Sequence, residues 1–367
     1  MRILKNILTI SLTIATTVSM AGNKERIGQA GSSQLLINPW ASSAGMGGSN
    51  SAYLNGTEAF NWNISGLSAV NKTELYYSNV MLFSGSDISI NSLGFGQRVG
   101  ESSVLGISVN AMSFGDIPIT TTANPDGGQG TFSPQFLNLA IGYARTFSNS
   151  IQGGGAIRIV SESINNVGAT GVALDAGIRY VTGEHDKAKF GIALRNVGPK
   201  LRYSGDGLAT TVLLQDAEFT VNQRAEGFEM PALLNIGASY DIYLLAKEPA
   251  EGEEATEVDD DAKPSDYRLT LAGTYTSNSF SPDQIRIGAE FGFLKYFAVR
   301  GGLVYEESVF SALGEGGRLN SNTGPSLGMS LMLPFKKKEE TGFSFDYGYR
   351  FSNPLGGTHS IGLRLSI

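Results

Sequence analysis

Along most of this chain, every second residue is apolar, and the residues between are small, polar or charged. In the segment G-F-S-F-D-Y-G-Y-R-F-S-N (Gly342 to Asn353), five aromatic residues occupy every second position and small or charged residues fill the gaps. Successive side chains of a β-strand point to opposite faces of its sheet. The alternation therefore predicts strands with one apolar face and one face of small, polar and charged residues.

Repeated segments of this kind predict a barrel. Counting them gives about fourteen strands of roughly ten residues, the length that lets a tilted strand cross a bilayer. The predicted strands are 73–82, 88–99, 102–114, 135–147, 151–164, 169–182, 187–198, 230–243, 266–277, 283–294, 296–306, 325–335, 342–351 and 358–367.

The lengths of the connections agree with this interpretation. Long connections at Gly115–Pro134, Gly198–Glu229 and Glu306–Gly324 all follow odd-numbered strands, whereas most connections after even-numbered strands are short. Outer-membrane barrels have long outside loops and short periplasmic turns. The acidic segment 248–266 is the exception, and it is interpreted either as a solvated turn or as a surface for a metal or a partner.

Two folds compete for an exported chain of alternating strands. In a soluble β-sandwich, the polar face should be rich in Lys, Glu and Thr; here it is rich in Gly and Ala. A closed barrel satisfies every backbone polar group within hydrocarbon. We therefore expect an all-β fold, a transmembrane antiparallel barrel with its aromatic faces toward lipid.

Composition narrows the function classes. The net charge of −7 argues against a nucleic-acid partner, because no basic surplus is present to neutralise phosphates. The chain has no cysteine, which excludes disulfides, cysteine-ligated zinc and a lipid anchor on cysteine. No motif predicts a cofactor.

The N-terminus predicts export to the outer membrane. Arg2 and Lys5 precede a short apolar stretch and the small residues around Ala21, as in a signal peptide spanning residues 1–21. The alternative, a single anchoring helix, needs a longer apolar stretch of about 20 residues. Residues 22–72 are then expected to form a plug inside a barrel of residues 73–367, with the plug residues Trp40, Trp62, Asn63, Gly66 and Leu67.

Charged residues recur on the face that would line the lumen. They either contact a solute or an inserted segment, or they form structural ion pairs that fill a wide barrel. Asp175 lies on the strand between those of Arg158 and Arg195, and Glu290 lies beside the strand of Arg300. The candidate residues are Arg158, Asp175, Arg179, Arg195, Glu290, Arg300, Asp346 and Arg350.

Catalysis has little support. The two histidines, His185 and His359, are both expected in turns, and a G-x-S-x-G nucleophile elbow is absent. We expect a protein that is not an enzyme, and a surface hydrolase is the least supported function.

The sequence resembles the PorV/PorQ family of Bacteroidota, which is related to the FadL fatty-acid transporters. The resemblance covers nearly the whole mature chain. It rests on G-M-G-G (Gly45 to Gly48), W-N-I-S-G-L (Trp62 to Leu67), G-D-I-P-I-T (Gly115 to Thr120), N-V-G-P (Asn196 to Pro199) and Y-S-G-D-G-L (Tyr203 to Leu208). Ile64 stands where the family has proline, and the chain ends in Ile367 instead of an aromatic residue.

The resemblance implies a FadL-like barrel of fourteen strands that serves type IX protein secretion. Its implied partners are the translocon barrel protein, secreted proteins with C-terminal signal domains, a surface attachment protease and membrane lipids. The outside loop with Ile117, Pro118, Ile119 and Phe132 is the candidate surface for a partner or cargo, unless these residues pack on neighbouring loops. The alternative function is FadL-like transport of a hydrophobic small molecule.

Overall fold

A computed structural model describes most of the chain. It covers residues 24–215, 217–244, 267–294, 296–312, 314, 317–318, 320–335, 341–352 and 354–367. The expected signal peptide, residues 1–21, and the acidic segment 248–266 lie outside the described residues.

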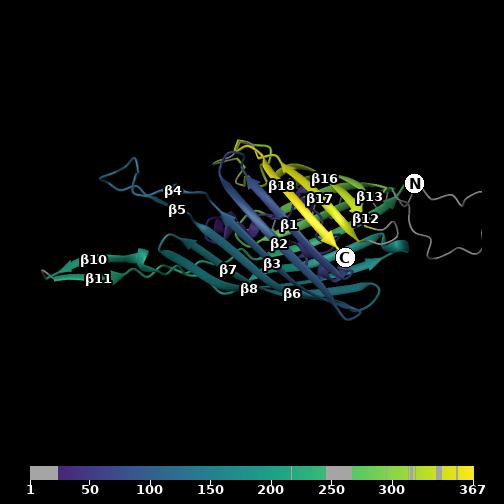
Figure 1. The fold of residues 1–367 in the computed structure, drawn as a ribbon, viewed down its shortest axis with the longest axis horizontal. Helices are drawn as coiled ribbons and strands as arrows, with labels where there is room; N and C mark the ends of the chain where they lie inside the picture. Colours follow the sequence, from purple (N-terminus) through teal and green to yellow (C-terminus); the bar gives the residue numbers. More distant parts are fainter. Residues whose placement is uncertain are drawn as a thin grey trace, which may run out of the picture.

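Fourteen antiparallel strands of the described chain close into one barrel (Figure 1). Each strand pairs with the next barrel strand along the chain, and β1 pairs with β18 to close the ring. The barrel strands are β1 (Thr73–Leu82), β2 (Ile88–Val99), β3 (Ser103–Ser113), β6 (Gln135–Thr146), β7 (Ile151–Ile164), β8 (Val167–Thr182), β9 (Ala188–Val197), β12 (Leu233–Tyr243), β13 (Tyr267–Asn278), β14 (Gln284–Phe293), β15 (Phe297–Tyr305), β16 (Gly324–Pro334), β17 (Gly342–Arg350) and β18 (Thr358–Ser366). The predicted fold class and strand number are confirmed, and every predicted strand boundary lies within three residues of the observed one.

Two short hairpins inside the long loops were not predicted. One pairs β4 (Ile117–Pro118) with β5 (Thr131–Phe132), and the other pairs β10 (Ala209–Leu214) with β11 (Ala217–Asn222). Both project from the same end of the barrel, and the C-terminus lies toward the other end (Figure 1). We call the end with the hairpins the loop end.

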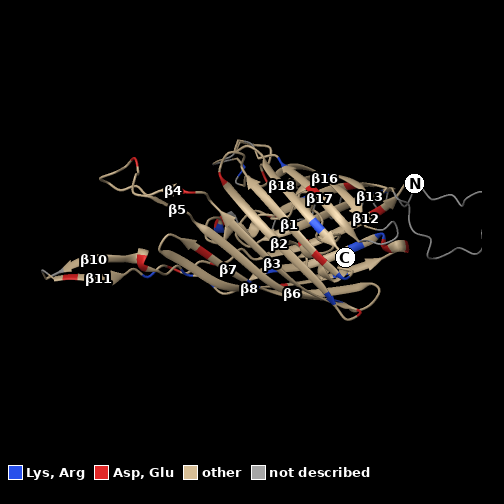
Figure 2. Cartoon of the chain, viewed as in Figure 1, with Lys and Arg blue, Asp and Glu red and all other residues tan. Residues whose placement is uncertain are grey.

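The outer wall of the barrel is apolar. Outward side chains such as Ile157 and Leu174 are each 56% exposed. The outward aromatic side chains of β17 are exposed or half-buried. Charged residues are sparse on the barrel strands (Figure 2). Apart from Arg145 near the end of β6, each of them lies at an inward-facing position. An apolar outer surface on a closed barrel is the arrangement of an outer-membrane protein. None of the described helices has the length and apolar character needed to cross a membrane.

Residues 24–72, which we call the inner segment, enter the barrel. The segment contains η1 (Lys24–Arg26), η2 (Ser33–Leu36), α2 (Ala41–Gly45), η3 (Thr57–Asn61) and η4 (Ile64–Ala69). Nearly every residue from 38 to 68 is buried. Helix α2 contacts β16 and β17, whereas η4 contacts β6, β7 and β8 on the other side of the ring (Figure 1, purple). The segment therefore crosses the lumen.

Inward-facing glycines on the strands make room for the inner segment. A Cβ at Gly177 would lie 2.1 Å from Asn63 Oδ1, and one at Gly302 would lie 2.2 Å from the carbonyl carbon of Met46. Glycine weakens a strand but permits close approach of another backbone. Similar contacts under 3.0 Å occur at Gly94, Gly142, Gly191, Gly237, Gly288, Gly328 and Gly348. The 47 glycines of the chain therefore serve partly to let the wall approach the inner segment.

Candidate functional site

The lumen between the wall and the inner segment is where polar side chains gather. Arg158 on β7 bonds Asp175 on β8 through Nε and Nη2, at 3.2 and 2.7 Å. Its Nη2 also donates to the backbone oxygen of Phe60 at 2.8 Å. The pair thus joins two strands to the inner segment.

An irregularity in the β8–β9 pairing accompanies this ion pair. The register shifts between Leu174 and Ala176, and Asn196 on β9 has a φ of 59°. The backbone N–H of Asn196 donates to Asp175 Oδ1 at 2.7 Å. Asp175 therefore satisfies a backbone donor that the β-bulge turns away from the ladder.

Two further candidate arginines hold the inner segment directly. Arg179 Nη1 donates to the backbone oxygen of Leu54 and to Asn55 Oδ1, both at 2.8 Å. Arg195 Nη2 donates to Asn61 Oδ1 at 3.2 Å. Both guanidinium groups bind neutral oxygens of the segment.

A second charged cluster lies on the opposite wall. Glu290 accepts from Arg300 Nε at 2.5 Å and from Arg268 Nη2 at 2.7 Å, and it also accepts from the hydroxyl of Tyr53 in the inner segment. Arg300 Nη1 lies 3.7 Å from Asp346 Oδ1. Arg300 is thus shared between two carboxylates on β14 and β17.

Arg350 differs from the other candidate charges. It is buried at the end of β17, and its Nε has no hydrogen-bond partner among the described residues. The structure therefore places all eight candidate charges inside the barrel but joins them into separate groups, with Arg350 apart.

The candidate plug residues are buried inside the barrel, and most of them contact its wall. Trp40 stacks on Tyr76 of β1, with ring centroids 5.1 Å apart. The guanidinium of Arg286 lies 4.9 Å from the ring of Trp62. Leu67 is fully buried in a cluster with Phe60, under β3 and β6.

Asn63 and Gly66 shape the turn of η4. Asn63 Oδ1 caps the helix by accepting from the backbone N–H of Ser65 at 3.2 Å, and Asn63 Nδ2 donates to the backbone oxygen of Ile178 at 3.1 Å. A Cβ at Gly66 would lie 2.3 Å from the backbone oxygen of Leu54. The W-N-I-S-G-L stretch thus forms this turn with isoleucine at position 64.

Three carboxylates that join the inner segment to the rest of the barrel were not identified from the sequence. Glu74 Oε1 accepts from the backbone N–H of Thr57 at 2.7 Å, and Glu58 pairs with Arg364. Glu162 accepts hydrogen bonds from Ser32, Gln34 and Tyr203. Glu74 and Glu162 occupy inward positions of their strands, so strand parity is the signal that could have identified them.

The loop between β9 and β12 folds back over the lumen at the loop end. Leu201 and Met230 from this loop pack with Leu35 of η2 and with Val160 of β7. Glu229 pairs with Arg26 at 3.2 Å. Burial and the hydrogen bond to Glu162 raise the pKa of the Tyr203 phenol above its usual value.

The candidate partner loop is only partly exposed. Ile117 pairs with Phe132 across the β4–β5 hairpin, and the N–H of Ile119 donates to the backbone oxygen of Gly130 at 2.9 Å. Ile117 and Pro118 are exposed, whereas Ile119 and Phe132 are half-buried.

The histidines lie apart. His185 lies in the turn η5 (Glu184–Asp186), as expected. The expectation of a turn at His359 is wrong, because β18 begins one residue earlier and the imidazole Nδ1 lies 2.8 Å from the Tyr347 hydroxyl on the outer face. In the described parts of the chain, no three His, Asp or Glu side chains are grouped to hold a metal ion.

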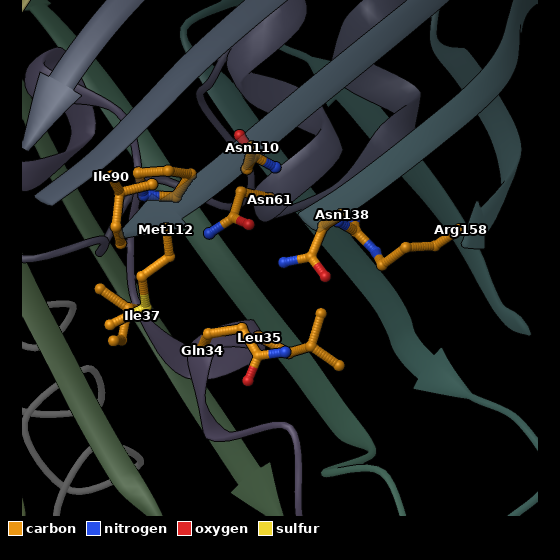
Figure 3. Close-up of a pocket in the computed structure, with 10 residues that line it drawn as sticks. Gln34, Leu35, Ile37, Asn61, Ile90, Asn110, Met112, Asn138 and Arg158 are labelled. Atoms are coloured by element: carbon orange, nitrogen blue, oxygen red, sulfur yellow. The ribbon is translucent and has the colours of Figure 1, made fainter. Parts of the chain in front are cut away.

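A small cavity lies between η2, η3 and the wall of β2, β3, β6 and β7. Its volume is about 10 Å³. Figure 3 shows the carboxamides of Asn61, Asn110 and Asn138 gathered around it, with Arg158 behind them and Gln34 below.

Comparisons with known proteins identify the type of barrel. No protein family and no curated protein matches the sequence. Among solved structures, the Pseudomonas putida toluene transporter TodX is 13% identical with a TM-score of 0.52, covering 89% of this chain and 96% of its own. The Ralstonia pickettii toluene transporter TbuX is 14% identical with a TM-score of 0.51, covering 89% and 98%.

A Pseudomonas aeruginosa FadL homologue is 11% identical with a TM-score of 0.50, covering 90% of this chain and 98% of its own. At these identities the likeness concerns the fold, which is FadL-like over nearly the whole chain. The narrower PorV/PorQ resemblance rests on the sequence motifs alone.

Proposed function

We propose that the protein is an outer-membrane channel that carries a small hydrophobic molecule, with the inner segment as its plug. The observation that supports this most is the FadL-like fold over about nine-tenths of the chain, shared with two proteins named as toluene transporters. From these proteins the proposal takes only the class of solute, a small hydrophobic molecule. It does not assign toluene as the solute of this chain.

The contacts of the inner segment fit a plug that shifts as a unit. Arg158, Arg179 and Arg195 hold it through hydrogen bonds to oxygens of the segment. Each such bond contributes about 0.5–1.5 kcal/mol net, or somewhat more when charged. A shift of the segment would exchange these bonds for bonds to water, and it would also break the apolar contacts of Phe60 and Leu67 with β3 and β6.

An apolar cluster lies beneath the β9–β12 loop at the loop end. It consists of Leu35, Val160, Leu201 and Met230, each at most 3% exposed, where the loop meets the inner segment. Movement of the loop would expose this cluster, and an apolar molecule gains about 25 cal/mol per Å² buried by leaving water for such a surface. We propose the cluster as the first contact of the solute after that movement.

A disulfide between plug and wall tests the channel. A Cβ at Gly237 would lie 2.3 Å from Ser51 Oγ, so cysteines at these two positions are within reach of a bond. In cells that lack the native gene, the oxidised Ser51→Cys/Gly237→Cys protein should take up radiolabelled toluene at least about tenfold more slowly than the wild type, and reductant should restore uptake.

The Ser51→Cys single variant is the matched control and should be unaffected by oxidant. Uptake that is the same with and without the native gene, or that continues through the locked plug, would contradict the proposed channel.

A second candidate function is a non-enzymatic role in type IX secretion, as the sequence motifs suggest. The β10–β11 hairpin favours it, because Leu213 and Phe219 are 68% and 52% exposed on a ribbon that projects from the loop end. Such a surface suits binding to secreted proteins or to the translocon. The partners would be the translocon barrel protein, C-terminal signal domains and the attachment protease.

Detergent pull-down from outer membranes separates the two functions. Recovery of a large barrel protein and secreted cargo, together with loss of several secreted proteins in a deletion strain, would support the second function. Normal secretion with impaired uptake of one apolar nutrient would support the channel.

A further inference from the structure

The small cavity of Figure 3 combines two kinds of surface. Gln34 comes from η2 of the inner segment, and Asn110 and Asn138 face each other across β3 and β6. The side-chain oxygens of all three lack hydrogen-bond partners, and the residues are only 5%, 5% and 6% exposed. Burying a carbonyl oxygen without a hydrogen-bond donor is unfavourable.

The other side of the cavity is hydrocarbon. Leu35, Ile37, Ile90 and Met112 line it. Ile90 belongs to a buried cluster on which Ile37 and Met112 pack. A ligand of this cavity therefore meets hydrogen-bond acceptors on one side and apolar groups on the other.

Charge selects among the groups that could occupy the cavity. Arg158 lines it and repels a cation, although its guanidinium is already bonded to Asp175 and Phe60. The three unpartnered carbonyl oxygens repel an anion. A neutral hydrogen-bond donor fits both conditions.

Size limits the polar group further. A volume of about 10 Å³ is about that needed by one water-sized group. A hydroxyl fits this space, and the rest of a larger molecule would have to lie against Ile37 and Met112, which are only partly buried.

We propose that this cavity binds the hydroxyl group of the transported molecule, so that the solute is an apolar compound with one neutral hydrogen-bond donor. The proposal rests on the proposed channel function and adds the chemistry of its solute. The hydroxyl donates its one proton to a carbonyl oxygen of Gln34, Asn110 or Asn138, and the apolar body lies against Ile37 and Met112.

Three benzene derivatives of similar size test this selectivity. Phenol, toluene and benzoate place a hydroxyl, a methyl and a carboxylate on the same ring. Titration calorimetry on the purified full-length protein in detergent, corrected by a micelle blank, should give a Kd for phenol at least about tenfold below those for toluene and benzoate. One good hydrogen bond is of this magnitude.

Substitutions assign the selectivity to the cavity. Asn138→Leu and Asn110→Leu should each bring the Kd for phenol to within about twofold of that for toluene. Asn91→Leu, on the exposed outer face of β2, is the matched control and should keep the tenfold preference. If a leucine variant does not fold, as judged by thermal unfolding, Asn110→Ala replaces it.

Several results would overturn the proposal. They are equal binding of phenol and toluene, no binding of any probe, or an unchanged preference for phenol in the folded Asn110 and Asn138 variants. Failure of toluene uptake together with selective phenol binding would contradict the channel function and support the cavity site. Toluene uptake without selective phenol binding would contradict the cavity site and support the channel function.

Discussion

At the residue scale, strand parity carries most of the information in this sequence. Alternation assigned residues such as Asp175 and Glu290 to the lumen, and both side chains are buried there. Parity alone did not identify the partners of these charges, because Phe60, Asn61 and Tyr53 come from a segment without strand periodicity. The same limit explains why the unpartnered carboxamides around the Figure 3 cavity were not foreseen.

Gly302 and Gly273 allow a direct test of the inward glycines. Gly302→Ala should lower the free energy of unfolding by about 1–3 kcal/mol, because the new Cβ would lie 2.2 Å from Met46. Gly273→Ala, two strands away and facing outward, meets its nearest atom at 3.8 Å and should change stability little. Thermal unfolding in detergent, followed as the loss of the fast-migrating folded band, measures both. Equal effects of the two substitutions would argue against close packing of the inner segment.

At the scale of elements, the barrel strands and the loop hairpins behave differently. Each barrel strand buries one face, so its pattern is strong and its boundaries were predicted within three residues. All described side chains of β11 are exposed, so no buried face imposes a pattern there. The hairpin was therefore treated as irregular loop.

Removal of the β10–β11 hairpin should leave the barrel intact. Residues 209–222 pair with each other and with no barrel strand. Replacement by a short Gly-Ser linker should shift the unfolding temperature by less than about 2 °C, a change of about 1 kcal/mol at most. If the deletion abolishes recovery of secreted proteins in the pull-down, the second candidate function gains support. A barrel that no longer folds would show that the hairpin is part of the scaffold.

At the scale of the whole molecule, the two ends of the barrel differ. The two hairpins and the loop that packs on η2 lie at the loop end, whereas short turns such as residues 147–150 lie at the other. In outer-membrane barrels the long loops face the outside. The loop end is therefore expected at the cell surface.

Cysteine labelling of intact cells tests this orientation. The chain contains no cysteine, so a single introduced thiol has no background. A membrane-impermeant maleimide should label Thr211→Cys in β10 and leave Asn149→Cys, in the turn after β6, unlabelled until the cells are opened. The reverse pattern would invert the barrel and place the β9–β12 loop in the periplasm.

The sequence by itself determined the strands, their number and the face that each turns to lipid, because these follow from local alternation with a period of two. Only the tertiary structure decided how residues 24–72 thread the lumen, which carbonyl each arginine holds, and where unpartnered carboxamides meet an apolar wall. Those contacts join residues far apart in the chain, such as Asn63 and Ile178. They depend on closure of the ring, which local patterns do not encode.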